Sequence, residues 1–185
     1  MKRVVLGLLF LVLFFRLEGN YSNKGVSPSG QMASEVSAGL PVRLKIPSIN
    51  IDAGVQYLGV NSKGEMEVPS NIVDVGWFEL GPKPGEKGSA VIAGHFNGES
   101  GEAGIFAELY KLKSGDRVEV EDEKGIKTIF VVRESRIYNP GYADEVFGSN
   151  DNVHLNLITC DGYWDGTKKS FSKRLVVFTD RELDK

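Results

Sequence analysis

The only cysteine of the chain, Cys160, closes a run of residues with the pattern of a β-strand. The run is Val153-His154-Leu155-Asn156-Leu157-Ile158-Thr159-Cys160, and it begins with apolar and polar residues in alternation, the period of a half-buried strand. The pair Asp161-Gly162 follows and predicts a turn that ends the strand. A thiol held at a strand end near a surface suits a nucleophile, so Cys160 is the first candidate for covalent catalysis.

Two other predicted strand ends carry side chains that could assist this thiol. His95 follows the apolar run Ser89–Gly94, and Arg174 opens the apolar run that continues to Thr179. The thiolate is the nucleophilic form of cysteine, and a neighbouring cation favours it. His95 could carry protons between the thiol and a substrate. Arg174 could stabilise an oxyanion with donors that stay protonated near neutral pH. The three residues together predict a cysteine enzyme.

Three segments carry a resemblance to a known family: Ala93-Gly94-His95, Leu157-Ile158-Thr159-Cys160 and Lys173-Arg174. In this order they resemble the sortases, which are cell-surface transpeptidases of mostly Gram-positive bacteria. The resemblance covers roughly Leu44–Phe178 and includes Ile46-Pro47-Ser48-Ile49, where sortases usually show an Ile-Pro-x-Ile pattern. The segments Val75-Gly76-Trp77-Phe78 and Gly81-Pro82-Lys83-Pro84-Gly85 resemble the compact sortases of class F or class E.

This resemblance implies a role for each candidate residue. It makes Cys160 the nucleophile, His95 the general acid and base, and Arg174 the residue that positions substrate and stabilises the oxyanion. Thr159 matches a family position that contacts substrate or transition state. Trp77 could line a substrate groove, although aromatic side chains more often pack in cores.

The resemblance also implies the reaction. Sortases cleave a C-terminal sorting signal of the Leu-Pro-x-Thr-Gly kind between Thr and Gly and hold the protein as an acyl-thioester. An amine on a peptidoglycan precursor, or on another protein such as a pilin, then resolves the thioester. We expect surface proteins with such a signal as partners, and no cofactor and no nucleic acid.

Other interpretations of the same residues stay open. A buried free cysteine is usually a small apolar residue, His95 could be a hydrogen-bonded strand-end residue, and Arg174 could be an edge charge that opposes aggregation. The chain would then be a membrane-tethered, non-catalytic β module, an adhesin or a scaffold. A cell-surface cysteine peptidase that hydrolyses is a nearer alternative, because the outcome depends on which nucleophile reaches the thioester. His154 precedes Cys160 by six residues, about 20 Å along a strand, and is expected to be a surface residue.

No metal site is expected. Two histidines and one cysteine do not have the spacing of zinc ligands. The acidic residues Glu99, Glu102, Asp161 and Asp165 could offer oxygen ligands to calcium, but no loop has the spacing that such a site requires. We expect these residues to be solvated loop charges.

Length and composition indicate one domain and exclude few function classes. A chain of 185 residues fits a single domain with a sizeable core. The net charge of −3, with no lysine and arginine cluster, gives no indication of nucleic-acid binding. A single cysteine excludes an intramolecular disulfide and does not reveal the compartment.

The N-terminus indicates the compartment. Met1-Lys2-Arg3 is followed by the apolar run Val4–Phe15 and then Arg16, which is the pattern of an export signal. The run is shorter than the roughly 20 residues that span a bilayer, and no small-x-small cleavage site follows closely. We expect an uncleaved, single-pass signal anchor in the cell membrane, with a cleaved signal peptide as the alternative. The expected parts are a signal anchor over 1–18, a flexible linker over 19–40 and an extracytoplasmic catalytic domain over 41–185.

From Pro41 onward, short runs rich in Val and Ile alternate with Gly, Pro, Asn and Asp, which is typical of an all-β barrel or sandwich. The expected strands are Val42–Ile46, Ala53–Val60, Ser89–Gly94, Arg117–Glu121, Ile126–Ile137, Val153–Thr159 and Arg174–Thr179, with a further short strand near Met66–Val68 or Val75–Trp77. The sortase resemblance makes this fold an eight-stranded β-barrel.

Shorter signals lie between these strands. Ile105–Leu112 has apolar residues at helical spacing and predicts a short helix, and Pro140–Phe147 predicts a second one. Asp122-Glu123-Lys124-Gly125 predicts a hairpin turn in which glycine supplies the positive-φ position.

Overall fold

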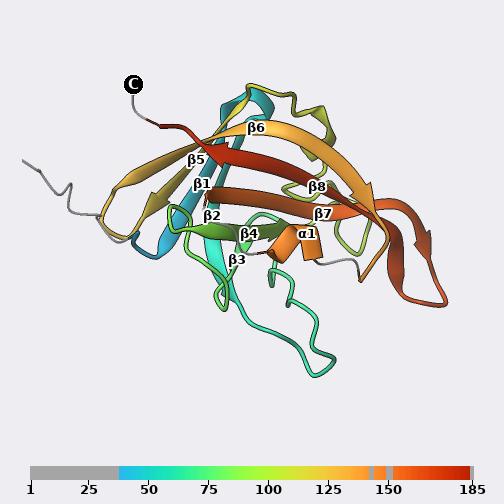
Figure 1. The fold of residues 1–185 in the computed structure, drawn as a ribbon. Helices are drawn as coiled ribbons and strands as arrows, with labels where there is room; N and C mark the ends of the chain where they lie inside the picture. Colours follow the sequence, from blue (N-terminus) through green and yellow to red (C-terminus); the bar gives the residue numbers. More distant parts are fainter. Residues whose placement is uncertain (1–37, 142–143, 149–151, 184–185) are drawn as a thin grey trace, which may run out of the picture. The chain divides into compact units, whose positions relative to one another are not determined.

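Eight β-strands close into a barrel in the computed structural model, which describes residues 38–141, 144–148 and 152–183 (Figure 1). The strands are β1 (Pro41–Ile46), β2 (Ile51–Leu58), β3 (Val75–Phe78), β4 (Gly88–Gly94), β5 (Arg117–Asp122), β6 (Lys127–Tyr138), β7 (Val153–Asp165) and β8 (Ser170–Arg181). The short helices are η1 (Pro47–Ile49), η2 (Leu109–Lys111) and α1 (Asp144–Phe147). The predicted all-β, eight-stranded barrel is confirmed, and of the two places named for a further short strand, Val75–Trp77 is the one that forms β3.

The strand order around the barrel is β1-β2-β3-β4-β7-β8-β6-β5, and β5 pairs with β1 to close it. The pairs β2–β3 and β4–β7 are parallel, and the other neighbouring strands run antiparallel. The parallel β4–β7 pair matters most for function, because it brings the C-terminal end of β4 beside the second half of β7.

Side chains of β7 and β8 alternate between the inside and the outside of the barrel, as strand geometry requires. Leu155 and Leu157 of β7 and Val177 of β8 belong to the large interior cluster, together with fully buried Phe106 and Phe130. A second apolar cluster lies on the outer side. Its buried members are Val91, Val146, Val176 and Phe178, with Val146 contributed by α1. The outer side of this sheet is therefore partly covered, and α1 packs there against β4.

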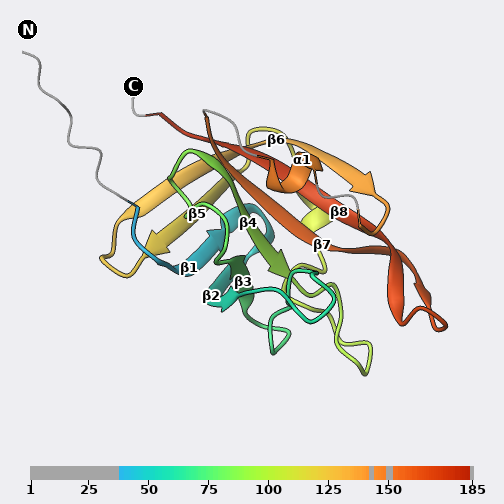
Figure 2. The same ribbon diagram turned by 60° about the horizontal axis from the view of Figure 1, so that its bottom comes forward.

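The strand that carries Cys160 is longer than the sequence predicts. The predicted turn at Asp161-Gly162 is wrong: β7 continues to Asp165, and β8 begins at Ser170 rather than at Arg174. Gly162 adopts φ 78°, and the register between the two strands shifts here, so the glycine forms a bulge within the ribbon. The N–H of Tyr163 donates to Oγ of Ser172 at 3.1 Å and holds the strands together beyond the bulge. Figures 1 and 2 both show this ribbon continuing past the barrel.

The predicted helix over Ile105–Leu112 is a series of tight turns that ends in η2. Its hydrogen bonds join residues three apart, such as Leu109 N to Phe106 O and Leu112 N to Leu109 O, both at 3.2 Å. Phe106, Leu109 and Leu112 are all buried. A spacing of three residues puts side chains on one side of a 3₁₀ turn, so these apolar positions fit that structure as well as an α-helix. The second predicted helix, Pro140–Phe147, shortens to α1.

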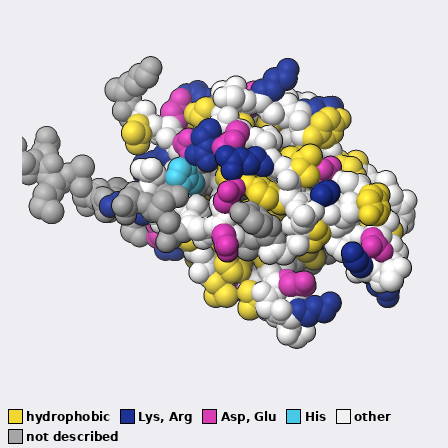
Figure 3. Space-filling model, turned by 45° about the vertical axis from the view of Figure 1, so that its right-hand side comes forward, with side chains coloured by type: hydrophobic (Ala, Val, Ile, Leu, Met, Phe, Trp, Pro, Cys, Tyr) yellow, Lys and Arg dark blue, Asp and Glu magenta, His cyan; other side chains and the backbone are white. Residues whose placement is uncertain are grey.

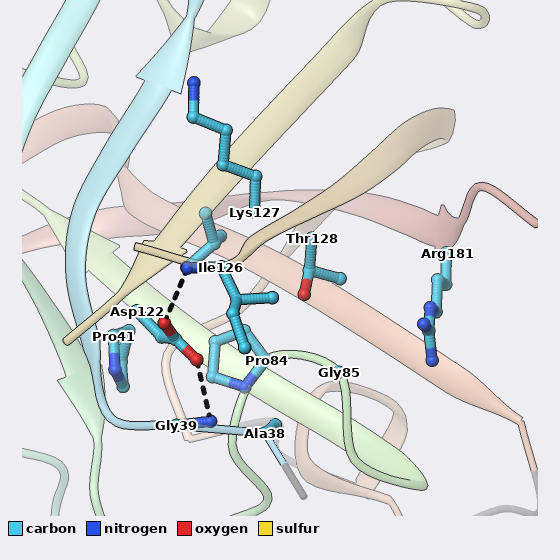
Figure 4. Close-up of a pocket in the computed structure, with 11 residues that line it drawn as sticks. Ala38, Gly39, Pro41, Pro84, Gly85, Asp122, Ile126, Lys127, Thr128 and Arg181 are labelled. Carbon is cyan, nitrogen blue, oxygen red and sulfur yellow. Dashed lines mark hydrogen bonds between the residues drawn. The ribbon is translucent and has the colours of Figure 1, made fainter. Parts of the chain in front are cut away.

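The predicted hairpin turn between β5 and β6 is confirmed. Gly125 adopts φ 76°, and its N–H donates to the backbone oxygen of Asp122 at 2.9 Å. The Asp122 carboxylate accepts backbone N–H groups from Lys124 and Ile126 at 2.9 Å and from Gly39 at 3.1 Å. Figure 4 shows this carboxylate in a small cavity of about 100 Å³, beside the segment that leads into β1. Asp122 therefore fixes both the turn and the point where the chain enters the barrel.

The predicted signal anchor over 1–18 and most of the linker over 19–40 lie outside the described residues. The proposed division into anchor, linker and domain therefore stays a prediction. Within the part of the chain that the structure describes, no helix has both the length and the apolar character needed to cross a bilayer.

Candidate active site

Cys160 lies on the outer side of the barrel, where β7 leaves it. Leu155 and Leu157 point into the interior cluster, so Ile158 and Cys160 point outward by strand alternation. The Cys160 side chain is a free thiol and is half-buried. The sequence predicts that this thiol lies at a strand end, whereas it lies within β7, at the point where the β7–β8 pair leaves the barrel.

Arg174 is directly opposite Cys160 in the antiparallel β7–β8 pair. Opposed residues project from the same face with Cβ atoms about 4.5–5.5 Å apart, so the guanidinium and the thiol share one surface. The Arg174 guanidinium donates to the backbone oxygens of Phe171 and Lys173 at 3.0 and 2.9 Å and to Oγ of Ser170 at 3.0 Å. The first residues of β8 therefore hold the guanidinium in place.

His95 follows β4 directly, on the other side of β7. The parallel register pairs Ala93 with Ile158, and extending it by two residues places His95 beside Cys160. Neighbouring strands lie about 4.8 Å apart. Cys160 on β7 therefore lies between Arg174 on the neighbouring strand β8 and His95, which follows the other neighbouring strand, β4.

Thr159 fixes that register. Its side chain is buried, and its hydroxyl donates to the backbone oxygen of Gly94 at 2.8 Å. The bond joins the residue before Cys160 to the residue before His95. The hydroxyl is therefore engaged within the barrel wall, and the expected contact of Thr159 with substrate stays a prediction.

Trp77 is placed away from this surface. Its side chain is 3% exposed, belongs to the interior cluster and donates from Nε1 to the backbone oxygen of Pro82 at 3.0 Å. Its ring contacts Tyr57 edge-on, with centroids 5.8 Å apart. The structure therefore gives Trp77 the core-packing role that was the alternative, and its side chain is not exposed to line a substrate groove.

The electrostatic surroundings of Cys160 act in opposite directions. Burial raises the pKa of the Cys160 thiol, and the positive charge of Arg174 lowers it by less, so the net pKa lies above the ordinary value. The resting side chain is a protonated thiol near neutral pH. A nucleophilic attack therefore needs a group that takes the proton, and His95 is the nearest predicted candidate.

Three backbone contacts fix the segment that carries His95. Its Nε2 lies 2.8 Å from the backbone oxygen of Pro69, and its own backbone oxygen accepts the N–H of Phe106 at 2.9 Å. Gly104 packs against the same carbonyl: a Cβ at this position would lie 2.6 Å from the His95 carbonyl carbon. No sequence pattern indicates these contacts, since each joins His95 to a segment outside the strands.

Aromatic rings connect the β7–β8 ribbon to the histidine segment. Phe96, which follows His95, contacts Phe171 of β8 edge-on at 5.7 Å between centroids. Phe171 in turn contacts Trp164 of β7 at 5.4 Å. Phe171 also supplies a backbone oxygen to Arg174. These aromatic residues are not part of the pattern of polar residues at strand ends, so that pattern does not indicate them.

His154 lies in a separate polar region on the outer side of the barrel. Its side chain is 14% exposed, and its Nδ1 is 2.7 Å from Oδ1 of Asp180, which also pairs with Arg133 at 2.6 Å. His154 and Arg133 line a cavity of about 270 Å³, together with Arg136 and Glu145. The expected surface residue is thus mostly buried and paired. Figure 3 shows a face of the molecule on which Lys and Arg side chains lie among Asp and Glu side chains.

The described acidic residues do not assemble into a metal centre. Among residues 38–141, 144–148 and 152–183, no group of three His, Cys, Asp or Glu side chains could hold a metal ion. Asp165, considered above as a calcium ligand, accepts the N–H groups of Thr167 and Lys168 at 3.0 and 3.2 Å and so closes the turn of the β7–β8 ribbon.

The protein is a closed β-barrel in which a cysteine and an arginine lie opposite each other on neighbouring strands, an arrangement suited to thiol chemistry. A family model for the sortase domain matches residues 44–182, which is most of the chain. The chain therefore belongs to the sortase family, whose members are in general cysteine transpeptidases.

Solved structures of sortases have the same fold. Sortase C from Clostridium perfringens SM101 is 25% identical with a TM-score of 0.58, over 79% of this chain and 72% of that one. Sortase C1 of Streptococcus agalactiae, in a complex with MTSET, is 25% identical with a TM-score of 0.61, over 77% and 69% of the two chains. Sortase A from Corynebacterium diphtheriae, a lid mutant, is 21% identical with a TM-score of 0.62, over 78% and 72%. None of the curated protein sequences compared with the chain matches it. These structures are sortases of classes A and C, so the resemblance to class F or E stays a prediction.

Proposed function

We propose that this sortase cleaves a C-terminal sorting signal of the Leu-Pro-x-Thr-Gly kind and transfers the protein to an amine. The observation that carries the proposal is the register of three adjacent strands. It sets Cys160 opposite Arg174 and next to the end of β4, which His95 follows directly. The three side chains have the types needed for a thiolate nucleophile, a proton carrier and an oxyanion donor.

In the first half-reaction, Cys160 loses its proton to His95, and the sulfur attacks the carbonyl carbon of the Thr-Gly bond. A C–S bond forms, and the carbonyl oxygen becomes an oxyanion that Arg174 stabilises. The C–N bond then breaks, and His95 returns a proton to the departing glycine amine. The products are an acyl-thioester on Cys160 and a free C-terminal fragment.

In the second half-reaction, an amine attacks the thioester carbonyl. His95 accepts a proton from the amine as the new C–N bond forms. The C–S bond breaks, and the sulfur leaves as a thiolate that is then reprotonated. We propose that the acceptor is a peptidoglycan precursor or a pilin and that the enzyme is held at the cell membrane by Val4–Phe15, with its catalytic domain outside the cytoplasm.

The test is mass spectrometry of the enzyme mixed with a sorting-signal peptide library and an amine. We expect an acyl-enzyme adduct on Cys160 and a peptide–amine product. Cys160→Ala should form neither, and His95→Ala should fold normally but lose turnover. Release of hydrolysed peptide with no amine product would instead favour a peptidase. Normal transfer by Cys160→Ala would contradict the proposed mechanism.

A further inference from the structure

One peptide unit in the loop between β2 and β3 contacts two side chains at once. The carbonyl of the Pro69–Ser70 peptide bond lies 2.8 Å from Nε2 of His95. The N–H of the same bond donates to Oε1 of Gln56 at 2.9 Å. Pro69 is buried, whereas Gln56 is half-buried on β2. A single planar unit therefore links a glutamine on the barrel wall to the imidazole proposed to carry protons.

The contact determines which ring nitrogen of His95 carries hydrogen. A backbone carbonyl only accepts hydrogen bonds, so Nε2 must be the donor. In the neutral imidazole the other nitrogen, Nδ1, then holds the lone pair. Proton transfer needs a lone pair at a defined atom, because the direction of that lone pair decides which group can deliver the proton.

Gln56 is itself held by the loop that it supports. Its Nε2 donates to Oδ2 of Asp74 at 3.2 Å, and Nδ2 of Asn71 donates to the same oxygen at 2.8 Å. The hydroxyl of Ser70 adds a second donor to Oε1 of Gln56 at 3.1 Å. The glutamine amide therefore has partners on both its oxygen and its nitrogen, which fixes its orientation.

The far side of the loop is fixed separately. Oδ1 of Asn71 accepts the N–H groups of Val73 and Asp74 at 3.0 and 2.8 Å, and the backbone oxygen of Ile72 accepts the N–H of Ile105 at 2.8 Å. These bonds lie just after the Pro69–Ser70 bond and restrain the loop there. The orientation of the peptide unit itself depends on Gln56, which is the side-chain acceptor of its N–H.

We propose that Gln56 is a positioning residue that acts through the Pro69–Ser70 peptide unit to hold His95 as the Nε2–H tautomer. Nδ1 of His95 is then the atom that takes the thiol proton and returns it to the leaving amine. The second statement rests on the proposed function, because it assumes that His95 is the proton carrier. The first is a statement about the structure and can be tested without substrate.

The test uses ¹⁵N spectra of the imidazoles, recorded at about pH 8.5, above the ordinary range of histidine titration. The chain has only two histidines, and His154→Gln assigns their signals. In the wild type we expect His95 to have a protonated Nε2 and an unprotonated Nδ1. Gln56→Met should give a mixture of the two tautomers. Its kcat for transfer should fall about threefold to tenfold with little change in KM, the effect of losing one neutral hydrogen bond.

Two matched variants serve as controls. Ser70→Ala removes the hydroxyl but leaves the backbone N–H that bonds Gln56, so spectrum and kcat should stay as in the wild type. Glu67→Ala removes another bond of the same loop, from the Gly59 N–H at 3.1 Å, without touching the Pro69–Ser70 unit, and should also leave both unchanged. Gln56→Leu also removes the acceptor of the Ser70 N–H and should likewise give a mixture of tautomers, which provides a second test if Gln56→Met does not fold.

The outcomes separate the two proposals. A wild-type spectrum with Nδ1 protonated would overturn the positioning role, and so would an unchanged tautomer and kcat in Gln56→Met. A shift of tautomer in Gln56→Met, in an enzyme that transfers no peptide to any amine, would support the link between Gln56 and His95 and reject the proposed function.

Discussion

Cys160 and Arg174 occupy opposed positions in one antiparallel strand pair, so the ladder between β7 and β8 sets their separation. Burial raises the pKa of the thiol, and the arginine charge offsets only part of that increase. Arg174 consequently has two effects that can be measured separately. Its charge changes the thiolate population, and its donors act on the substrate.

We expect Arg174→Ala to slow the alkylation of Cys160 by iodoacetamide at neutral pH by about threefold to tenfold, the effect of one neighbouring charge in a solvent-screened site. The sign follows because loss of the cation raises the thiol pKa further and reduces the thiolate fraction. The measurement is the alkylation rate as a function of pH.

Arg174→Lys separates the two effects. It keeps the charge and should alkylate nearly as fast as the wild type. Its transfer rate should still fall by about 10²–10³-fold, the loss of kcat that follows removal of one oxyanion donor. The reason is that lysine lacks the planar guanidinium with its fixed set of N–H donors. Undiminished transfer by this variant would show that the donors of Arg174 play no part in the reaction.

Gly104→Ala should displace the histidine segment. The added Cβ would meet the His95 carbonyl, and backbone atoms cannot move aside as a flexible side chain can. We expect kcat for transfer to fall by about tenfold or more, since small misplacements of catalytic groups are costly. The rate of Cys160 alkylation should change little, which distinguishes a displaced His95 from a general disruption of the fold. Gly166→Ala is the matched control, because nothing lies within 4 Å of its added Cβ; equal losses in the two variants would refute the explanation.

Asp122 should make stability depend on pH. Burial raises the pKa of its carboxyl, but the N–H groups of Ile126, Lys124 and Gly39 together lower it by more, and the net pKa lies below the ordinary value. The stabilisation is therefore fully present above the unfolded pKa of about 3.9 and is lost as the pH falls through the lower folded pKa.

Asp122→Ala should reduce the free energy of unfolding at pH 7 by about 1–3 kcal/mol, the cost of leaving buried donors unpaired. Denaturant titrations at neutral and acidic pH should show the difference from the wild type shrinking below about pH 4. Asp122→Asn, which keeps one acceptor oxygen, should lose less. A difference that does not change with pH would mean that the ionised carboxylate is not the stabilising form.

The predicted anchor can be tested by fractionation. We expect the full-length protein in the membrane fraction and a protein that starts at Ala38 in the soluble fraction, because only the former has the apolar run Val4–Phe15. N-terminal sequencing distinguishes an uncleaved anchor from a cleaved signal peptide. Equal solubility of the two proteins, with residue 1 retained, would argue against a membrane anchor.

The sequence was sufficient to find the candidate residues but not the contacts that arrange them. His95, Cys160 and Arg174 stand out because each is a polar, chemically capable side chain beside an apolar strand pattern. The strand register is not encoded locally, since it depends on which strands become neighbours in the closed barrel. The link from Gln56 to His95 passes through a loop without periodicity, so no pattern in the chain indicates it.

The errors have local physical causes. Asp161-Gly162 predicts the end of a strand because positive φ is common in turns, yet the same conformation of Gly162 fits a bulge within a strand pair. Ile105–Leu112 predicts a helix, but apolar residues three apart satisfy both the α and the 3₁₀ spacing, and the structure has the 3₁₀ turns. Residue type alone makes Trp77 a candidate for a groove, whereas its burial in the barrel depends on the register of β3 with its neighbours.

Two separate parts of the fold hold the candidate site: the bulged ribbon of β7 and β8 holds Cys160 and Arg174, and the segment after β4 holds His95. The Cys160 thiol and the Arg174 guanidinium lie side by side in the β7–β8 pair where the ribbon leaves the barrel, before the bulge at Gly162, so bending of the ribbon beyond the bulge would preserve their spacing (Figure 2). The His95 imidazole follows a different strand, β4, and this segment is held by hydrogen bonds to Pro69 and Phe106. One strand ladder therefore sets the separation of Cys160 from Arg174, whereas the separation of Cys160 from His95 depends on the Thr159–Gly94 bond and on the loop contacts of His95. Phe96, next to His95, contacts Phe171 of the ribbon edge-on, so a motion of the ribbon would reach the histidine segment through these two rings.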